Sequence, residues 1–358
     1  MTGRSDTVMV GRAASGLSTL LSIWKEDGIP KKIALPSLLC QSPLAAVLYA
    51  GWEPVFCDID PETGNVPLNE WMRVINHGVH AVLFVHLYGN VGDAGRIAAI
   101  CRSRNVYFIE DAAQSLGGSW EGQPCGSFGD ASIISFGHTK LIDVGHGGAV
   151  ATDDPDLANE VKTTESRRTE YPPNPETIAN NFRENFYAAR RQLVSNPGRG
   201  AEYFRGLIDS YMPLVAVRWR PEVSEDILHR LETLDTLVRE RREKYELYKA
   251  LLRDTPLAPL RMSLGSVPWR AVFRLPGIDW AVQNAISEAV RKNGVDLSNW
   301  YIPSHWLMQD QHESGIDLLR STEQLSQEIF QLWIDAKTDK DEIKRAACVF
   351  AATISAMS

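Results

Sequence analysis

Strand-like and helix-like segments alternate through the first half of the chain. Strands are predicted for the short apolar runs at residues 32–36, 54–58, 81–86 and 106–109. Helices are predicted where apolar residues recur at helical spacing, at residues 17–24, 43–50 and 94–104. This order is typical of a mostly parallel sheet with helices on both faces, so the pattern predicts an α/β fold.

The pattern changes after residue 165. Residues 165–214 form a long polar and aromatic stretch, which we interpret as helical insertions and loops that cover one edge of a large domain. Residues 222–252 predict one long helix, because apolar side chains follow at helical spacing and the other positions are charged. We expect this helix to lead into a smaller domain.

The last hundred residues predict a strand and two helices. The strand is at residues 269–275 and the helices at 278–293 and 340–354, the last with Thr338 and Asp341 as a capping box. We therefore expect a large domain at residues 1–235, with the insertion at 165–214, followed at 236–358 by a linking helix and a small α+β domain.

Composition and charge narrow the function classes. The chain has 358 residues, of which 44% are hydrophobic and 23% charged, which is ordinary for a folded protein. Its formal net charge of -8 argues against a general nucleic-acid binder and against binding to an anionic membrane. A site for a phosphorylated ligand must therefore be local.

The cysteines predict neither a disulfide framework nor a zinc site. The five cysteines are scattered and never form a C-x-x-C pair, so we interpret them as reduced thiols, and we expect no bound metal. No apolar run reaches the roughly 18 residues of a membrane-spanning helix. We expect a cytoplasmic protein.

Residues 107–140 place an acid, candidate phosphate donors and an amine in that order. A strand-like run ends in Glu110 and Asp111, the segment Gly-Ser-Phe-Gly-Asp follows at 126–130, and Ser135 precedes Lys140. Pyridoxal phosphate requires a carboxylate at its ring nitrogen, hydrogen-bond donors around its phosphate and a lysine for its aldehyde. Asp111 also falls at the carboxyl end of a predicted strand, where ligands of parallel sheets bind.

The small residues at 11–16 predict a second contact with the phosphate. They precede a helix, and free N–H groups at a helix start suit an anion. The alternative is a helix start whose small residues only allow close packing.

Several motifs, in the same order, resemble the DegT/DnrJ/EryC1/StrS family of pyridoxal-phosphate-dependent aminotransferases. They are Pro36-Ser37, Ala46 to Gly51, Pro54 to Asp60, Val85 to Gly89, Ile109 to Gln114, and Ser135 to Lys140 with Gly147-Gly148. The resemblance is dense at residues 11–155 and thinner at 215–255. It implies the type I fold of pyridoxal-phosphate transferases, with a seven-stranded, mostly parallel sheet and a smaller C-terminal domain.

The resemblance implies two catalytic roles. Lys140 matches the family lysine that attaches to the cofactor as a Schiff base and then carries a proton between the substrate and the cofactor. Asp111 matches the aspartate that pairs with the ring nitrogen and keeps it protonated. The alternatives are a surface lysine and a helix N-cap.

Further residues are implied to surround the cofactor. Ser135 matches the phosphate-binding serine, with a buried strand serine as its alternative, and Ala14 and Ser15 match the pair that offers backbone N–H groups. Gln114 matches a position near the ring oxygen, or it is a plain helix-surface residue. His86 fits an active-site wall, with a hydrogen-bonded core histidine as the equal alternative.

The chain departs from the family pattern in the lysine motif at residues 137–141, at His146, and at two positions expected to contact the cofactor. Cys40 stands in the loop where many relatives place an aromatic ring near the cofactor. Arg220 stands where an asparagine of relatives reaches across the dimer to the phosphate, and an arginine there can still donate to phosphate. Relatives also begin further upstream, with a segment that contributes to the sugar pocket, which weakens the inference about substrate.

The resemblance implies an aminotransferase that uses glutamate or glutamine to aminate a keto sugar. We expect the sugar to be nucleotide-linked and to serve surface-polysaccharide or natural-product biosynthesis, and we expect a homodimer that binds neither nucleic acid nor membrane. Two alternatives stay open: a pyridoxal-phosphate enzyme of another reaction type on the same scaffold, and a non-catalytic partner subunit.

Overall fold

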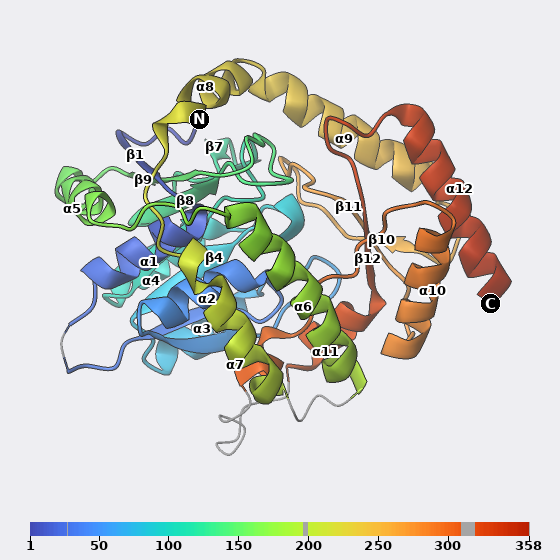
Figure 1. The fold of residues 1–358 in the computed structure, drawn as a ribbon, viewed down its shortest axis with the longest axis horizontal. Helices are drawn as coiled ribbons and strands as arrows, with labels where there is room; N and C mark the ends of the chain where they lie inside the picture. Colours follow the sequence, from blue (N-terminus) through green and yellow to red (C-terminus); the bar gives the residue numbers. More distant parts are fainter. Residues whose placement is uncertain (27, 196–199, 309–318, 358) are drawn as a thin grey trace.

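A seven-stranded mixed sheet forms the centre of the computed structural model, which describes residues 1–26, 28–195, 200–308 and 319–357 (Figure 1). Its strands are β1 (Asp6–Val10), β2 (Lys32–Pro36), β3 (Glu53–Cys57), β4 (Ala81–Val85), β5 (Tyr107–Asp111), β8 (Ala131–Ser135) and β9 (Gly148–Thr152), in the order β1-β9-β8-β5-β4-β2-β3. β3, β2, β4, β5 and β8 run parallel, and β9 is antiparallel to β8 and β1. The predicted α/β class with a mostly parallel sheet is confirmed.

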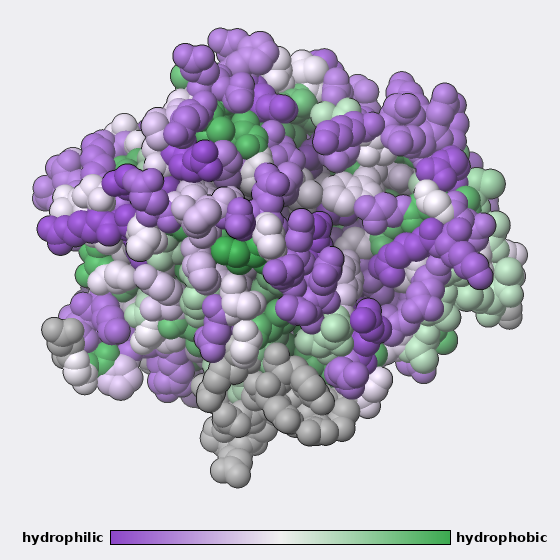
Figure 2. Space-filling model, in the orientation of Figure 1, coloured by the Kyte–Doolittle hydropathy of each residue, from purple (hydrophilic) through white to green (hydrophobic). Residues whose placement is uncertain are grey.

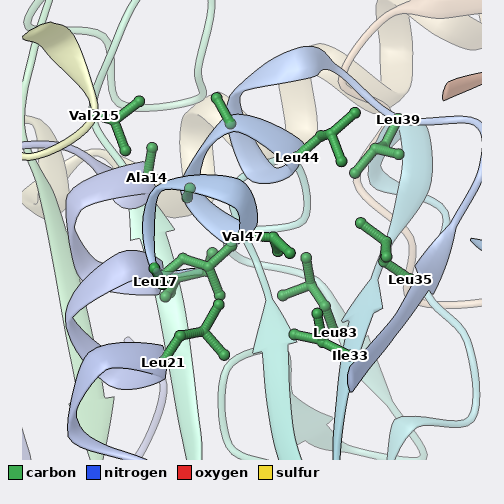
Figure 3. Close-up of a cluster of buried hydrophobic side chains, with 14 of the residues drawn as sticks. Ala14, Leu17, Leu21, Ile33, Leu35, Leu39, Leu44, Val47, Leu83 and Val215 are labelled. Atoms are coloured by element: carbon green, nitrogen blue, oxygen red, sulfur yellow. The ribbon is translucent and has the colours of Figure 1, made fainter. Parts of the chain in front are cut away.

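Helices cover both faces of this sheet, because its buried strands alternate their side chains between two cores. Leu83 belongs to the core under α1 (Ala13–Ile23), α2 (Gln41–Tyr49) and α5 (Pro155–Ser166). Its neighbours Val82 and Phe84 belong to the core under α3 (Leu68–Asn76) and α4 (Ala94–Ser103). Figure 3 shows the first core, in which Leu17 and Leu21 of α1 and Val47 of α2 lie close to Leu83.

Two helices pack over the same face within the stretch 165–214. They are α6 (Pro175–Ser195) and α7 (Gly200–Tyr211). Residues 196–199, which belong to the predicted insertion, lie outside the described residues. Phe186 and Phe204 join the core that contains α1 and α2. Phe182, Phe186, Phe204 and Tyr211 therefore lie on the buried faces of two amphipathic helices.

The single helix predicted for residues 222–252 is wrong in its continuity. A short 3-10 turn, η4 (Pro221–Val223), is followed by α8 (Ser224–Glu232) and α9 (Leu234–Leu251). The two helices are separated at Thr233, whose φ and ψ are -102° and 9°. The hydroxyl of Thr233 donates to the carbonyl of Arg230 at 3.0 Å, so this side chain competes with the helical hydrogen bonds.

A smaller antiparallel sheet lies beside the large one. Its strands are β10 (Ala258–Pro259), β11 (Ala271–Arg274) and β12 (Ile329–Leu332), and its helices are α10 (Trp280–Lys292), α11 (Arg320–Glu328) and α12 (Lys340–Met357). Tyr248 of α9, Phe273, Phe330 and Phe350 share one core with this sheet. The remaining short elements are η1 (Leu87–Gly89), β6 (Ser119–Trp120), β7 (Gln123–Pro124) and η3 (Met212–Leu214).

The capping box predicted for the last helix is displaced by one residue. Asp339, rather than Thr338, accepts from the N–H of Glu342 at 2.8 Å, and the Glu342 carboxylate accepts from the N–H of Asp339 at 3.0 Å. Thr338 instead donates to Asp335 at 2.9 Å. An aspartate at this position supplies the stronger acceptor.

The face of the molecule shown in Figure 2 is largely polar. Figure 2 shows hydrophilic residues over most of one face, with hydrophobic residues in small separate groups. Among the described helices, none is both long enough and apolar enough to cross a bilayer.

Gly129 tests how tightly the turn before β8 is packed. Its φ is 74°, and a Cβ there would lie 2.0 Å from Cδ1 of Phe108 and 2.8 Å from the Phe108 carbonyl. Gly122 has a φ of 83° with open space around it. We expect Gly129→Ala to lower the free energy of unfolding by about 2 kcal/mol more than Gly122→Ala, measured by urea denaturation, since both share the backbone strain and only Gly129 adds a clash. Equal losses would contradict the packing at Gly129.

Candidate active site

Asp111 ends β5 at the carboxyl edge of the parallel strands. The side chain is 6% exposed, and its Oδ1 accepts from the N–H of Ala113 at 2.9 Å. A turn follows at residues 113–117 rather than a helix, so the alternative of a helix N-cap is wrong. The hydrogen bond from the Ala113 N–H closes an Asx turn, which orients the Asp111 carboxylate.

A strained loop presents Lys140. Thr139 has a φ of 70°, which is a genuine outlier for a β-branched residue. The Asp143 carboxylate accepts from the N–H of Thr139 at 2.8 Å, and the indole of Trp269 donates to the Thr139 carbonyl at 2.8 Å. The surrounding structure therefore holds a backbone conformation that is rare outside functional sites.

The Lys140 amine lies in a desolvated region between charged groups. Its Nζ is 5.4 Å from the ring centroid of Trp269. Burial lowers the pKa of Lys140; Cys40 and Asp111 partly offset this effect, and Arg241 and Arg270 reinforce it. A lowered pKa leaves more of the amine neutral and nucleophilic, so the alternative of an ordinary surface lysine is not supported.

Burial acts in the opposite direction on Asp111. It raises the pKa of this carboxyl, although the Ala113 N–H, Lys140 and His86 hold it back. The mutual electrostatic interaction of Asp111 and Lys140 places both groups in one region. A cationic ring nitrogen beside Asp111 would complete the pairing that this carboxylate lacks.

The start of α1 and the end of β8 meet across one glycine. Gly148 pairs with Ser135 in the antiparallel ladder, and a Cβ on Gly148 would lie 2.5 Å from the nitrogen of Ala13. The N-cap residue of α1 makes no side-chain hydrogen bond, and the first turn contains no acid. The Ser15 hydroxyl, fully buried in that turn, has no hydrogen-bond partner. These groups form a cradle of donors that suits a phosphate.

Gln114 is fixed by two tyrosines. Its Oε1 accepts from the N–H of Tyr88 at 2.6 Å, and its Nε2 donates to the Tyr301 hydroxyl at 2.9 Å. The rings of Tyr88 and Tyr301 stack at 5.4 Å. The alternative of a plain helix-surface glutamine is therefore wrong, because Gln114 lies in a turn and has specific partners on both sides.

His86 is a core histidine with both nitrogens bonded. It is fully buried, Nδ1 accepts from the Gly92 N–H at 3.2 Å, and Nε2 donates to Glu110 at 2.8 Å. Glu110 also accepts from the N–H groups of Gly126 and Phe128. The structure thus favours the core alternative for His86, and the segment 126–130, expected among the phosphate donors, directs two of its N–H groups at this buried carboxylate instead.

The two departures from the family pattern that are expected to contact the cofactor lie in different places. Cys40 precedes α2 and is close enough to Lys140 and Asp111 to interact with both, while burial raises the pKa of its thiol. Arg220 is half-exposed, with its Nε 3.8 Å from Glu222 and its guanidinium 5.6 Å from the centroid of Tyr171. Of these two residues, Cys40 is the one that interacts with Lys140 of the same chain.

Four residues that the sequence did not single out join this region. They are Arg241, Trp269, Arg270 and Tyr301. Arg241 donates to the carbonyls of Trp269 and Lys140 at 2.8 and 3.1 Å, and so connects α9 to the lysine loop. The sequence feature that could have identified Trp269 and Arg270 is their position at the start of a predicted strand whose other residues are mostly apolar.

The residues present fit pyridoxal phosphate. An amine of lowered pKa lies near a buried carboxylate, and an unpartnered serine hydroxyl lies among free N–H groups at a helix start. The amine would hold the aldehyde, the carboxylate would pair with the ring nitrogen, and the helix start would hold the phosphate.

Comparison with known proteins gives a match to one family over most of the chain. Residues 1–181 and 227–350 match the model of the DegT/DnrJ/EryC1/StrS aminotransferase family. A dTDP-4-dehydro-2,3,6-trideoxy-D-glucose 4-aminotransferase of Saccharopolyspora spinosa is 37% identical over 130 residues, 36% of this chain and 34% of the relative. GDP-perosamine synthase of Escherichia coli O157:H7 is 35% identical over 151 residues, 42% and 41% of the two chains. The chain thus spans less than half the length of these relatives.

Solved structures show the same fold over nearly the whole chain. Helicobacter pylori PseC, an aminotransferase involved in the biosynthesis of pseudoaminic acid, superposes with a TM-score of 0.77 at 19% identity and covers 99% of this chain and 88% of its own. The PLP-form of the putative sugar aminotransferase Spr1654 from Streptococcus pneumoniae has a TM-score of 0.77 at 16% identity, with 100% and 89% covered. The predicted aminotransferase fold is confirmed.

The charge on Asp111 tests the electrostatics of the lysine. Asp111 raises the pKa of Lys140, so Asp111→Asn removes an interaction that favours the ammonium form. We expect the pH midpoint for covalent attachment of pyridoxal phosphate, followed by visible absorbance, to lie below 10.5 in the wild type and to fall further in the variant. An upward shift would contradict the arrangement.

His86 tests the distinction between a core and a catalytic histidine. His86→Leu leaves a buried Glu110 oxygen with one donor fewer and the Gly92 N–H without its acceptor. We expect the free energy of unfolding to fall by about 2 kcal/mol. The absorbance with pyridoxal phosphate should stay unchanged in the folded variant, and a lost cofactor band at full stability would instead place His86 in the active site.

Proposed function

We propose that this chain, which belongs to the DegT/DnrJ/EryC1/StrS aminotransferase family, is a pyridoxal-phosphate-dependent aminotransferase. Its amino donor would be glutamate or glutamine, and its acceptor a keto sugar. The observation that carries the proposal is the position of the Lys140 amine, which lies 5.4 Å from the Trp269 ring centroid and interacts electrostatically with the buried carboxylate of Asp111. A protein that only binds partners has no need of a nucleophilic amine at this place.

Each residue of the site has a defined task in this proposal. When bound, the cofactor withdraws electrons from the substrate carbon and makes its proton removable. The Lys140 amine accepts that proton and returns it to the neighbouring position, which requires an amine that is neutral at working pH. Asp111 holds a proton on the ring nitrogen, and Ala14, Ser15 and Ser135 bind the phosphate.

Gln114 and Cys40 have positioning tasks. Gln114, whose amide is bonded to Tyr88 and Tyr301, would lie near the ring oxygen. Cys40 stands in place of a stacking ring, so the cofactor face would contact a small thiol there. His86 supports Asp111 from the core through Glu110, the residue next to it in the chain.

The names of the relatives support a nucleotide-linked sugar as the acceptor. One relative is named as acting on a dTDP-linked dehydro sugar and another as a GDP-perosamine synthase. We propose the same class of acceptor here, in the biosynthesis of a surface polysaccharide or a natural product.

We further propose a homodimer in the cytoplasm. Arg220 would replace the family asparagine and donate to the phosphate held by the other copy, where a guanidinium binds more strongly than an amide. Within each copy, residues 1–235 would bind the cofactor and residues 236–358 would form the smaller domain, which packs its own core.

Replacement of Lys140 tests the proposal. We expect the wild type with pyridoxal phosphate to be yellow and to retain the cofactor covalently after borohydride, whereas Lys140→Ala retains none. Lys162→Ala, at an exposed lysine of α5, is the matched control and should behave like the wild type. The rate of amino transfer from glutamate, measured in a single turnover, should fall at least about 1,000-fold in Lys140→Ala.

Two results would contradict the aminotransferase proposal. Covalent retention by Lys140→Ala would remove the lysine from its role. Covalent attachment in the wild type without transfer from any amino acid of a broad donor panel would indicate another reaction type or a non-catalytic subunit.

A further inference from the structure

Arg270 is a buried cation that forms no salt bridge with the described residues, although Asp296 and Asp335 interact with it electrostatically. It opens the segment that leads into β11, and its side chain is 7% exposed. Nε and Nη1 are buried and have no hydrogen-bond partner. Burial lowers the pKa of Arg270 to about 10, which still leaves the guanidinium charged at neutral pH. A buried charge that lacks a partner is costly in a folded protein and marks a candidate binding site.

Two tryptophans hold this guanidinium by its faces. Its Cζ lies 3.3 Å from the ring centroid of Trp333 and 4.7 Å from that of Trp269. Trp333 is itself fixed by an indole hydrogen bond to Asp296 at 2.8 Å. Contacts with aromatic faces leave the N–H groups at the edge of the guanidinium for an anion.

Arg241, a second buried arginine near Lys140, has a structural role that can be compared with Arg270. Arg241 is 5% exposed, but its guanidinium donates to the carbonyls of Trp269 and Lys140. Arg270 has no comparable set of acceptors at Nε and Nη1. The two buried arginines therefore differ in what they contact, although both lie beside the lysine loop.

Trp269 connects Arg270 to the reacting amine. The Lys140 Nζ lies 5.4 Å from the centroid of the same indole ring that Arg270 contacts at 4.7 Å. Arg270 also interacts electrostatically with Tyr301, the hydrogen-bond partner of Gln114. It thus belongs to the part of the site formed by the small sheet, separate from the phosphate cradle of α1.

We propose that Arg270 forms the subsite that binds the carboxylate of the amino donor. The inference rests on the proposed aminotransferase function, because an amino acid that reacts at Lys140 carries a carboxylate one carbon away from its nitrogen. A planar guanidinium binds a carboxylate through two parallel hydrogen bonds, so it both attracts and orients the donor. Arg270 is a positioning residue in this assignment and takes no part in proton transfer.

Binding of glutarate, an unreactive dicarboxylate, tests the subsite directly. Isothermal calorimetry on the protein loaded with pyridoxal phosphate should give a dissociation constant about 10- to 100-fold higher for Arg270→Met than for the wild type. Arg270→Lys keeps the charge without the planar fork, and should fall between them. Arg239→Met is the matched control, because it removes an exposed arginine of α9 and should bind like the wild type.

Thermal unfolding separates a binding role from a structural one. Because Arg270 is buried and forms no ion pair within the described part of the chain, Arg270→Met should melt at or above the temperature of the wild type. A large fall in melting temperature for Arg270→Met, together with glutarate binding by Arg270→Lys equal to the wild type, would overturn the proposal and assign Arg270 to the packing of the two tryptophans. Arg270→Lys provides the binding comparison if the methionine variant does not fold.

Further outcomes distinguish the sources of the carboxylate. Glucuronate, titrated in the same way, represents an acidic sugar, and dependence on Arg270 for glucuronate alone would overturn the assignment to the donor. Equal glutarate binding by the wild type and Arg270→Met, or none by the wild type, would overturn the subsite. A different result would contradict the proposed function itself: a wild-type protein that does not attach pyridoxal phosphate at Lys140. That result would also remove the basis for assigning Arg270 to the amino donor.

Discussion

The buried carboxylate of Glu110 is the interaction on which the geometry of the site depends. Its Oε1 accepts from His86 at 2.8 Å and from the Gly126 N–H at 2.7 Å, and its Oε2 accepts from the Phe128 N–H at 2.8 Å. These bonds join the ends of β4 and β5 to the loop before β8. Removing any donor would leave a buried charge partly unsatisfied, which is why such an arrangement is rigid once it is complete.

Asp111 gains its position from this arrangement. Adjacent residues of a strand point to opposite faces, so Glu110 anchors β5 on one side while Asp111 faces the lysine loop on the other. Two carboxylates in sequence therefore have different tasks. The first is saturated by hydrogen bonds within the fold, whereas the second makes one bond, to Ala113, and retains capacity for a cationic partner.

Desolvation controls the chemistry around Lys140. The same burial lowers the pKa of the amine, raises that of Asp111 and leaves Arg270 without acceptors at two nitrogens. Burial of these groups costs stability in the protein alone, and a ligand with complementary charges at Asp111 and Arg270 would offset part of that cost. The strained Thr139 and the indole that bonds its carbonyl belong to the same pattern, since both maintain a loop conformation that local preference opposes.

The sequence by itself determined the class of the fold, and it singled out Lys140, Asp111 and the start of α1 as proposed cofactor contacts, because hydrophobic periodicity and motif spacing are local properties. It gave no role to Glu110, did not decide whether His86 lies in the core, and did not identify Arg270 and Trp269. It also predicted one helix where Thr233 separates two. Only the tertiary structure decided these points, because burial and hydrogen bonding depend on segments that are distant in the chain. Residues 110 and 126 meet at the end of β5 in the large sheet, and residues 139 and 269 meet where the segment before β11 packs against the lysine loop.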